Sequence, residues 1–218
     1  KFGDAVRQLA LEAGMQPYRF SNFDVEKEKR FQTYKKILKD YSEYHHKLIF
    51  EKESQAFNYL NSRGITKEII REFQIGFVPK ESNYFQQLLK KYSEKEILDT
   101  GLFYKNEQYN KFVNRFYSRI IFPIKNILGD TIAFGGRVIK ESKVAKYINS
   151  PETEFYKKGK HVFNLDKVKL NINKEQEVIV VEGYLDVISV YSSGLKNVVS
   201  NSGIALTENQ INLIWRFF

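Results

Sequence analysis

Two carboxylates and a glycine follow a short apolar run in the stretch EVIVVEGYLDVISV. Glu182 comes directly after the run, Gly183 follows it, and Asp186 lies four residues beyond Glu182. A pair of carboxylates suits Mg²⁺, which takes oxygen ligands and usually shares them with phosphate groups. The same spacing fits a strand that ends on a solvated acid, followed by a helix whose first turn carries an acid that the helix dipole favours. The spacing alone leaves both interpretations open.

The surrounding elements predict a parallel βαβ unit. The order is strand, helix, strand and helix, at residues 177–181, 184–194, 197–200 and 206–217. The apolar run before Glu182 is typical of a buried strand, and Thr207 is the expected N-cap of the last helix. Alternation at this spacing is typical of an α/β fold. Ligands in an open parallel sheet bind beyond the carboxyl ends of the strands, which is where Glu182 falls.

Helices precede a β-rich segment in the upstream part of the chain. Residues 24–61 carry aromatic and aliphatic side chains at spacings of three and four, which predicts one or two helices packed on a core. A break at Gly64 precedes a helix with Thr66 as its N-cap, and a short helix pair is expected within residues 84–101. Two β-rich runs within residues 119–139 are split by the loop NILGD, which predicts a hairpin.

The composition favours a basic globular protein with a polyanionic partner. The chain has 218 residues, 42% of them hydrophobic, and its 35 Lys+Arg against 26 Asp+Glu leave a formal charge of +9. Such an excess fits nucleic acid or an acidic membrane surface. The absence of Cys excludes disulfides and thiolate zinc sites within these residues. No run approaches the roughly 18 apolar residues of a transmembrane helix, so no membrane span is predicted.

The stretch VVEGYLDV resembles the first motif of the topoisomerase-primase (Toprim) domain, in the form found in bacterial DnaG-type primases. The resemblance does not depend on this motif alone. The segments RIIFPI, FGGR, KYINSPET and KKG, and the upstream stretch YLNSRGITKEIIREFQIGFVP, stand in the order and approximate spacing of the primase catalytic core. The resemblance covers nearly the whole chain from about Ala56 onward.

The resemblance implies a division into three parts. Residues 1–23 would be a linker from a zinc-binding domain that this chain lacks. Residues 24–175 would be the α+β N-terminal subdomain of the primase core, and residues 176–218 the start of an α/β Toprim domain. The chain begins without Met and ends within a helical pattern, so we expect it to be a fragment of a longer protein.

Members of this family synthesise short RNA primers on single-stranded DNA from ribonucleoside triphosphates during replication. The resemblance implies that Glu182 is a metal ligand or proton acceptor assisted by Asp186, with Mg²⁺ or Mn²⁺ as the catalytic ion. Zn²⁺ would belong only to the zinc-binding domain. Further family aspartates would lie beyond Phe218, so we expect these residues alone to be inactive. The resemblance also implies a cytoplasmic protein at the replication fork, which meets the replicative helicase through a C-terminal domain outside this chain.

The resemblance further implies a basic groove for the template, the nucleotides and the RNA primer. The residues expected to line it are Arg63, Arg115, Arg119, Arg137, Lys146, Tyr147, Asn149 and Lys158. Arginine binds phosphates at two points and lysine supplies a point charge. Gly135 and Gly136 are expected to let the backbone approach a phosphate or base, and Tyr147 to stack on an unpaired base.

Two other functions fit some of the same residues. One is a module that binds single-stranded DNA without chemistry. The other is a different Toprim enzyme, such as a topoisomerase or nuclease, although KYINSPET and FGGR argue against it. The chain also departs from the family pattern: Tyr117 stands where an Arg is common, and Ile204 replaces a Thr near the expected site. No departure removes an expected metal ligand.

Overall fold

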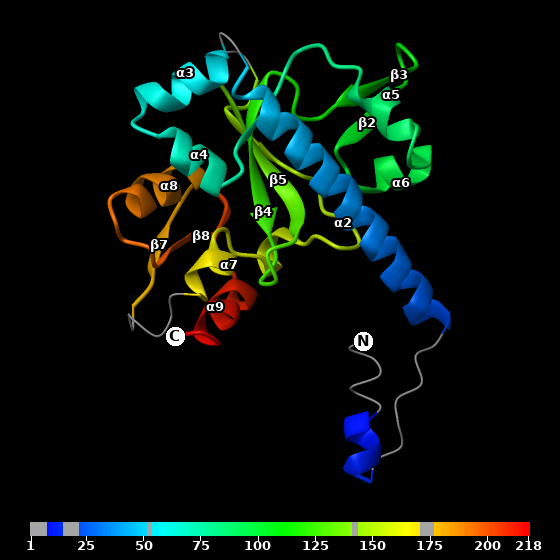
Figure 1. Ribbon diagram of the computed structural model, residues 1–218, viewed down its shortest axis with the longest axis vertical. Coiled ribbons are helices and arrows are strands. Elements are labelled where there is room, and N and C mark those ends of the chain that lie inside the picture. The colour runs from blue at the N-terminus through cyan, green and yellow to red at the C-terminus, as the bar shows by residue number, and fades with distance from the viewer. Residues whose placement is uncertain (1–7, 15–21, 52–53, 141–143, 171–176) are drawn as a thin grey trace. The chain divides into compact units, whose positions relative to one another are not determined.

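The computed structural model describes residues 8–14, 22–51, 54–140, 144–170 and 177–218 (Figure 1). The chain divides into two compact units, Lys1–Thr33 and Tyr34–Phe218. In the first unit, residues 8–12 are helical and the long helix α2 (Asn22–Leu48) begins. The second unit holds the remainder of α2 and every other named element.

A four-stranded antiparallel sheet forms the centre of the second unit. Its strands, in spatial order, are β1 (Gly76–Val78), β4 (Arg119–Lys125), β5 (Thr131–Val138) and β6 (Tyr147–Asn149). The predicted hairpin is confirmed as the antiparallel pair of β4 and β5, in which Ile120 lies opposite Arg137. Directly opposed residues of an antiparallel pair present their side chains on the same face. Arg137 therefore shares the face of Ile120, whereas Arg119 lies on the other face.

Helices cover the two faces of this sheet (Figure 1). The face of Ile120 packs in one hydrophobic cluster with residues of α3 (Gln55–Ser62), α4 (Lys67–Glu72) and α8 (Tyr184–Ser192). On the opposite face, the Tyr41 ring of α2 lies 5.2 Å from the Phe134 ring of β5. The helical stripe predicted within residues 24–61 is confirmed, and it is divided between α2 and α3.

Two short helices and a second hairpin lie beside α2. They are α5 (Tyr84–Leu89), α6 (Glu94–Asp99), β2 (Phe103–Asn106) and β3 (Lys111–Asn114). The helix pair was predicted, but the β2–β3 hairpin was not. Phe85 of α5 stacks on Phe112 of β3 with ring centroids 4.2 Å apart, so aromatic packing fastens the hairpin to the helices.

The C-terminal part confirms the predicted parallel βαβ unit. Its elements are η1 (Lys158–Lys160), α7 (Leu165–Val168), β7 (Ile179–Val181), α8, β8 (Val198–Ser200) and α9 (Glu208–Trp215). Strands β7 and β8 pair in parallel, with Ile179 opposite Val198. The predicted N-cap of α9 is also confirmed, because the Thr207 hydroxyl accepts the N–H of Gln210 at 3.2 Å.

The expectation of a buried strand before Glu182 was wrong. Ile179 and Val180 are 38% and 44% exposed. Within the described residues, β7 pairs with β8 alone, so one edge of the strand has no covering strand. In the same described part of the chain, no helix is long and apolar enough to cross a membrane.

Candidate functional site

Glu182 and Asp186, which we call the acid edge, lie at the carboxyl end of β7. Both side chains are exposed. The Glu182 carbonyl accepts a hydrogen bond from the Ser200 hydroxyl at 2.7 Å and another from the Gly203 N–H at 3.0 Å. These bonds fix Glu182 beside the end of β8, so the acid stands where parallel strands end together.

Asp186 combines the two interpretations that the sequence left open. Its Oδ2 accepts the N–H of Gly183 at 3.0 Å, so it caps the first turn of α8 while its side chain stays exposed. Carboxylate oxygens are the ligands that Mg²⁺ prefers, and the ion usually retains waters and substrate phosphates beside one or two carboxylates. The acid edge fits that donor set. Among the described residues no group of three or more metal-ligating side chains is found, so the acid edge is a pair.

Two arginines and two tyrosines form an alternating stack, which we call the arginine–tyrosine cluster. The Tyr59 ring lies 5.0 Å from the guanidinium carbon of Arg63 and 5.4 Å from that of Arg137. The Arg137 guanidinium carbon is also 4.8 Å from the Tyr147 ring, and its Nη1 donates to the Tyr147 hydroxyl. Cation–aromatic contacts of this kind hold a guanidinium in place without neutralising its charge.

Arg137 is the least solvated cation of this cluster. It is 6% exposed, and no carboxylate in the described residues forms an ion pair with it. Its Nε and the Tyr59 hydroxyl are buried without a hydrogen-bond partner among the described residues. A buried charge needs a counter-charge and a buried donor needs an acceptor. The arrangement therefore suits an anion that is supplied from outside the chain.

Electrostatics link the cluster to the acid edge. Burial raises the pKa of the Tyr147 hydroxyl, the positive charge of Arg137 opposes this shift, and the negative charge of Asp186 adds to it. The strands and helices connect the two groups as well, because Tyr147 of β6 pairs with Arg137, and Asn149 of the same strand accepts a hydrogen bond from Tyr184 at the start of α8, the helix that carries Asp186. Opposite charges on elements that are joined in this way suit a phosphate–metal complex.

The two glycines of FGGR serve packing, which corrects the expectation that they admit a phosphate or base. A Cβ on Gly135 would lie 2.2 Å from the Tyr184 ring, and one on Gly136 would lie 2.6 Å from the Phe116 ring. Successive residues of a strand point to opposite faces. Each glycine therefore admits an aromatic ring of the protein itself, one on each face of the sheet.

Arg115 and Arg119 lie outside the arginine–tyrosine cluster. Arg115 donates from Nε to the Gly101 carbonyl at 2.8 Å, and its guanidinium carbon is 5.4 Å from the Tyr104 ring of β2. Arg119 is on the opposite face of the sheet from Arg137 and donates to the Lys146 carbonyl at 3.3 Å. Burial lowers the pKa of the Arg119 guanidinium.

The remaining predicted contacts differ in their availability. The Lys146 side chain is exposed beside β6. Lys158 lies in η1, where its carbonyl accepts from the Gln210 side chain at 3.3 Å. Both ends of the Asn149 amide are used within the protein: Oδ1 accepts from the Tyr184 hydroxyl, and Nδ2 donates to the Ser202 carbonyl at 3.1 Å.

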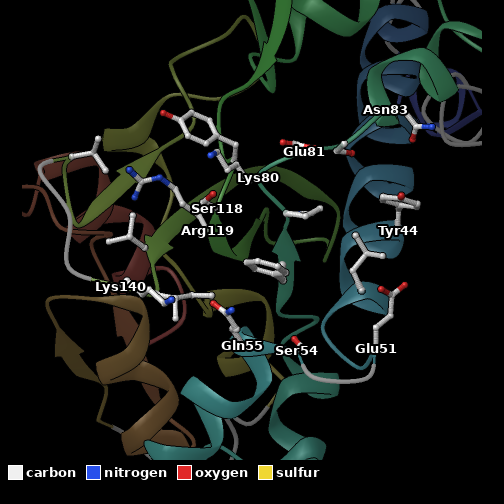
Figure 2. A pocket seen from close by; sticks show the side chains of 18 residues that line it. Tyr44, Glu51, Ser54, Gln55, Lys80, Glu81, Asn83, Ser118, Arg119 and Lys140 are labelled. Carbon is white, nitrogen blue, oxygen red and sulfur yellow. The ribbon is translucent and has the colours of Figure 1, made fainter.

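A cavity of about 1180 Å³ opens where β4 starts and β5 ends (Figure 2). Arg119 and Lys140 lie on one side of it, and Tyr44 and Glu51 of the α2 region lie on the other. Lysines and glutamates both line the cavity, so it does not favour one sign of charge. The cavity shares Arg119 with the predicted groove but does not include Arg137.

Sequence reasoning missed Tyr59 and Tyr184. Tyr59 stands four residues before Arg63, a spacing that places two side chains on one helix face, so this contact had a readable signal. Tyr184 is part of the VVEGYLDV motif, but its contacts are with β5 and β6. No local spacing in the sequence reports those contacts.

The comparisons with known proteins agree with this arrangement. The sequence model described as "DNA primase catalytic core, N-terminal domain" matches residues 43–169, and the one described as "Toprim-like" matches residues 179–217. The fold and site thus define a primase catalytic core joined to Toprim-like elements. More particularly, the chain belongs to the bacterial DnaG-type DNA primase family.

Relatives and solved structures extend over most of the chain. The DNA primase of Enterococcus faecalis is 40% identical over 181 residues, covering 79% of this chain and 29% of that protein. The DNA primase of Deinococcus radiodurans is 36% identical over 217 residues, covering 99% and 36%. The chain thus spans about a third of the length of these curated relatives.

Among solved structures, the DnaG primase catalytic domain bound to ssDNA superimposes with a TM-score of 0.79 at 29% identity, covering 87% of this chain and 59% of that one. The Aquifex aeolicus primase, with zinc-binding and RNA polymerase domains, gives 0.80 at 32% identity, covering 100% and 52%.

Proposed function

We propose that the protein acts as a DNA primase, a nucleotidyltransferase that joins ribonucleotides into short RNA primers on single-stranded DNA. The observation that carries this proposal is the buried Arg137, which forms no ion pair within the described residues and pairs with β6, the strand to which the acid-edge helix α8 is hydrogen-bonded. The phosphates of the DNA template and the nucleotide, together with a divalent metal, supply what these two groups need, namely negative charge for the arginine and positive charge for the acids.

Glu182 and Asp186 would hold the catalytic Mg²⁺ or Mn²⁺. When bound, such an ion neutralises charge on the reacting phosphate and on the leaving pyrophosphate. Arg137 and Arg63 would bind phosphate oxygens through their planar forks. The half-exposed Tyr147 would offer a stacking face to a base, and the exposed Lys146 would contact the backbone of the template.

The partners in this proposal are those of primer synthesis. They are a single-stranded DNA template, ribonucleoside triphosphates, the RNA primer and, through a domain outside this chain, the replicative helicase. Arg115, Arg119 and Lys158 would contribute to nucleic-acid binding outside the arginine–tyrosine cluster. Zn²⁺ would belong to a separate domain, and the protein would act at the replication fork in the cytoplasm. The family match supports the primase role, and a related structure with bound ssDNA supports the single-stranded DNA partner.

Glu182→Gln tests the proposal in the protein at its full natural length. We expect primer synthesis on single-stranded DNA with Mg²⁺ to fall by roughly 100-fold, because a neutral amide binds a divalent metal more weakly than a carboxylate does. This fall equals about 2.7 kcal/mol of transition-state stabilisation. Glu177→Gln is the matched control, since Glu177 is an exposed acid two residues before β7, at the end of the strand away from Glu182. Equal synthesis by both variants would contradict the role of Glu182.

A second candidate function is single-stranded DNA binding without chemistry. The observation that favours it is that the acid edge is a pair of carboxylates within the described residues. The 218-residue chain would then bind DNA as tightly as the longer protein does, and primer synthesis would be undetectable in both. Synthesis by the longer protein that is lost with Glu182→Gln decides for the enzyme.

A further inference from the structure

We propose that Tyr184 is a positioning residue that holds the acid edge in register with the arginine–tyrosine cluster. This inference rests on the proposed primase function. It deepens that function by assigning a role to a side chain that touches neither group of charged residues directly.

The Tyr184 ring is buried against the central sheet. It is 3% exposed, it stacks on Phe122 of β4 with ring centroids 5.4 Å apart and planes 9° apart, and it meets the Phe163 ring edge-on at 4.9 Å. The ring occupies the place that a Cβ on Gly135 would need, since that atom would lie 2.2 Å from it. This close packing fixes the position of the start of α8 against β5.

The Tyr184 hydroxyl adds a directional hydrogen bond to this packing. It donates to Oδ1 of Asn149 on β6, and Asn149 in turn donates from Nδ2 to the Ser202 carbonyl at 3.1 Å. Ser202 precedes Gly203, whose N–H donates to the Glu182 carbonyl. The loop after β8 and the first turn of α8 are therefore both tied to one amide of β6.

The same short strand carries the other half of the site. In the pairing of β5 with β6, Asn149 lies opposite Gly135, and Tyr147 lies opposite Arg137. Asn149, which holds the acid edge, is therefore two positions after Tyr147, whose ring contacts Arg137. Hydrogen bonds and the β6 backbone thus connect the acid edge with Arg137, by way of Tyr184 and the loop after β8.

This arrangement predicts an effect on rate that exceeds the effect on binding. Each half of the site would still bind its own ligands if the tie were cut, but their relative placement would loosen. Misplacement by about 1 Å costs up to roughly 100-fold in rate when reacting groups must be aligned. Asn149, with both ends of its amide engaged, acts in this proposal through Tyr184 and Ser202 rather than on the DNA strand.

Tyr184→Phe in the protein at its full natural length is the direct test. It keeps the ring over Gly135 and removes the hydroxyl, with its bond to Asn149 and its interaction with Ser202. We expect kcat for primer synthesis to fall about 10-fold, with KM for nucleotides and Kd for single-stranded DNA within about 2-fold of the unmodified protein. Tyr191→Phe is the matched control, because it removes a tyrosine-to-Glu72 hydrogen bond from the same helix without touching β6. We expect its kcat to stay within about 2-fold.

Backbone hydrogen exchange at Gly183 and Gly203 gives a readout that needs no activity. Both amides donate to groups of the acid edge, so loosening the tie is expected to speed their exchange in Tyr184→Phe and not in Tyr191→Phe. Unchanged exchange in Tyr184→Phe, or an equal loss of kcat in both variants, would overturn the proposal. If the unmodified protein made no primers at all, the proposed function would fail, and the exchange rates would still decide whether the tie exists.

Discussion

Arg137 is a cation that the fold buries among aromatic rings instead of carboxylates. The rings of Tyr59 and Tyr147 fix its plane, and its Nε has no partner among the described residues. The cost of burying such a charge is offset when an anion arrives. Tyr59 matters for the same reason, since it also contacts Arg63 and so spaces the two guanidinium groups.

Arg137→Ala is expected to weaken binding of single-stranded DNA by at least roughly 10-fold, because it removes the buried cation whose charge has no partner in the described chain. Arg137→Lys should recover part of the affinity, since lysine keeps the charge but loses the fork. Fluorescence anisotropy with labelled DNA measures both. The control is Arg71→Ala, which removes an exposed charge and a similar contact, that of Arg71 with the Phe50 ring at 5.1 Å. Equal affinities for the Arg137 and Arg71 variants would remove Arg137 from the site.

Helix α2 carries a buried histidine into the opposite layer of the molecule. His45 is fully buried, its Nδ1 donates to the Tyr41 carbonyl at 2.8 Å, and its Nε2 has no partner in the described residues. The rings of Tyr41, Tyr44 and Tyr84 surround it. Burial lowers the pKa of His45 to about 4, with the bond to Tyr41 opposing the shift.

The lowered pKa of His45 predicts that the folded protein loses stability in mild acid. The folded-state pKa lies below the unfolded value of about 6.5, so the unfolded chain takes up a proton first as the pH falls. The contribution of neutral His45 is complete above about pH 6.5 and declines towards pH 4. Lowering the pH from 7.5 to 5 should cost about 2 kcal/mol of unfolding free energy, measured by urea denaturation at each pH. His45→Phe should flatten that part of the curve, and an unchanged slope would show that other groups cause it.

The sequence predicts strand β5 but not the reason for the two glycines at its centre. Its β-rich run and the turn NILGD predict the hairpin correctly, since strand propensity and turn chemistry are local properties. The sequence cannot say why its centre is Gly135–Gly136. The space is occupied by the rings of Tyr184 and Phe116. Neither residue is a near neighbour of the two glycines in the sequence.

Across the whole molecule, the formal charge of +9 is consistent with a polyanionic partner. Only part of that charge lies at the site, because Arg119 is on the other face of the sheet and Arg115 lies with the β2–β3 hairpin. Binding should therefore depend on a few phosphate contacts more than on the total charge.

The salt dependence of DNA binding tests this view. If Arg63, Arg137 and Lys146 alone contact phosphates, log Kd should rise with log salt concentration at a slope of about 2, given a value of roughly 0.7 per phosphate for single strands. Phosphate contacts by Arg115, Arg119 and Lys158 in addition would raise the slope to about 4. Arg137→Ala should reduce the slope by about 0.7, and Arg71→Ala should leave it unchanged. A slope near that expected for nine contacts, about 6, would mean that the whole basic surface takes part.

The sequence by itself determined the local elements and the chemical types available. Several local features follow from interactions within a few residues, and all of them are confirmed. They are the helix caps Thr66 and Thr207, the β4–β5 hairpin, and the strand–helix–strand order around Glu182. Only the tertiary structure decided which charged residues meet. It gathered Arg63, Arg137 and Tyr147, placed Arg119 on the opposite face, and tied the acid edge to β6 through Tyr184, because these contacts depend on sheet register and on packing between distant segments.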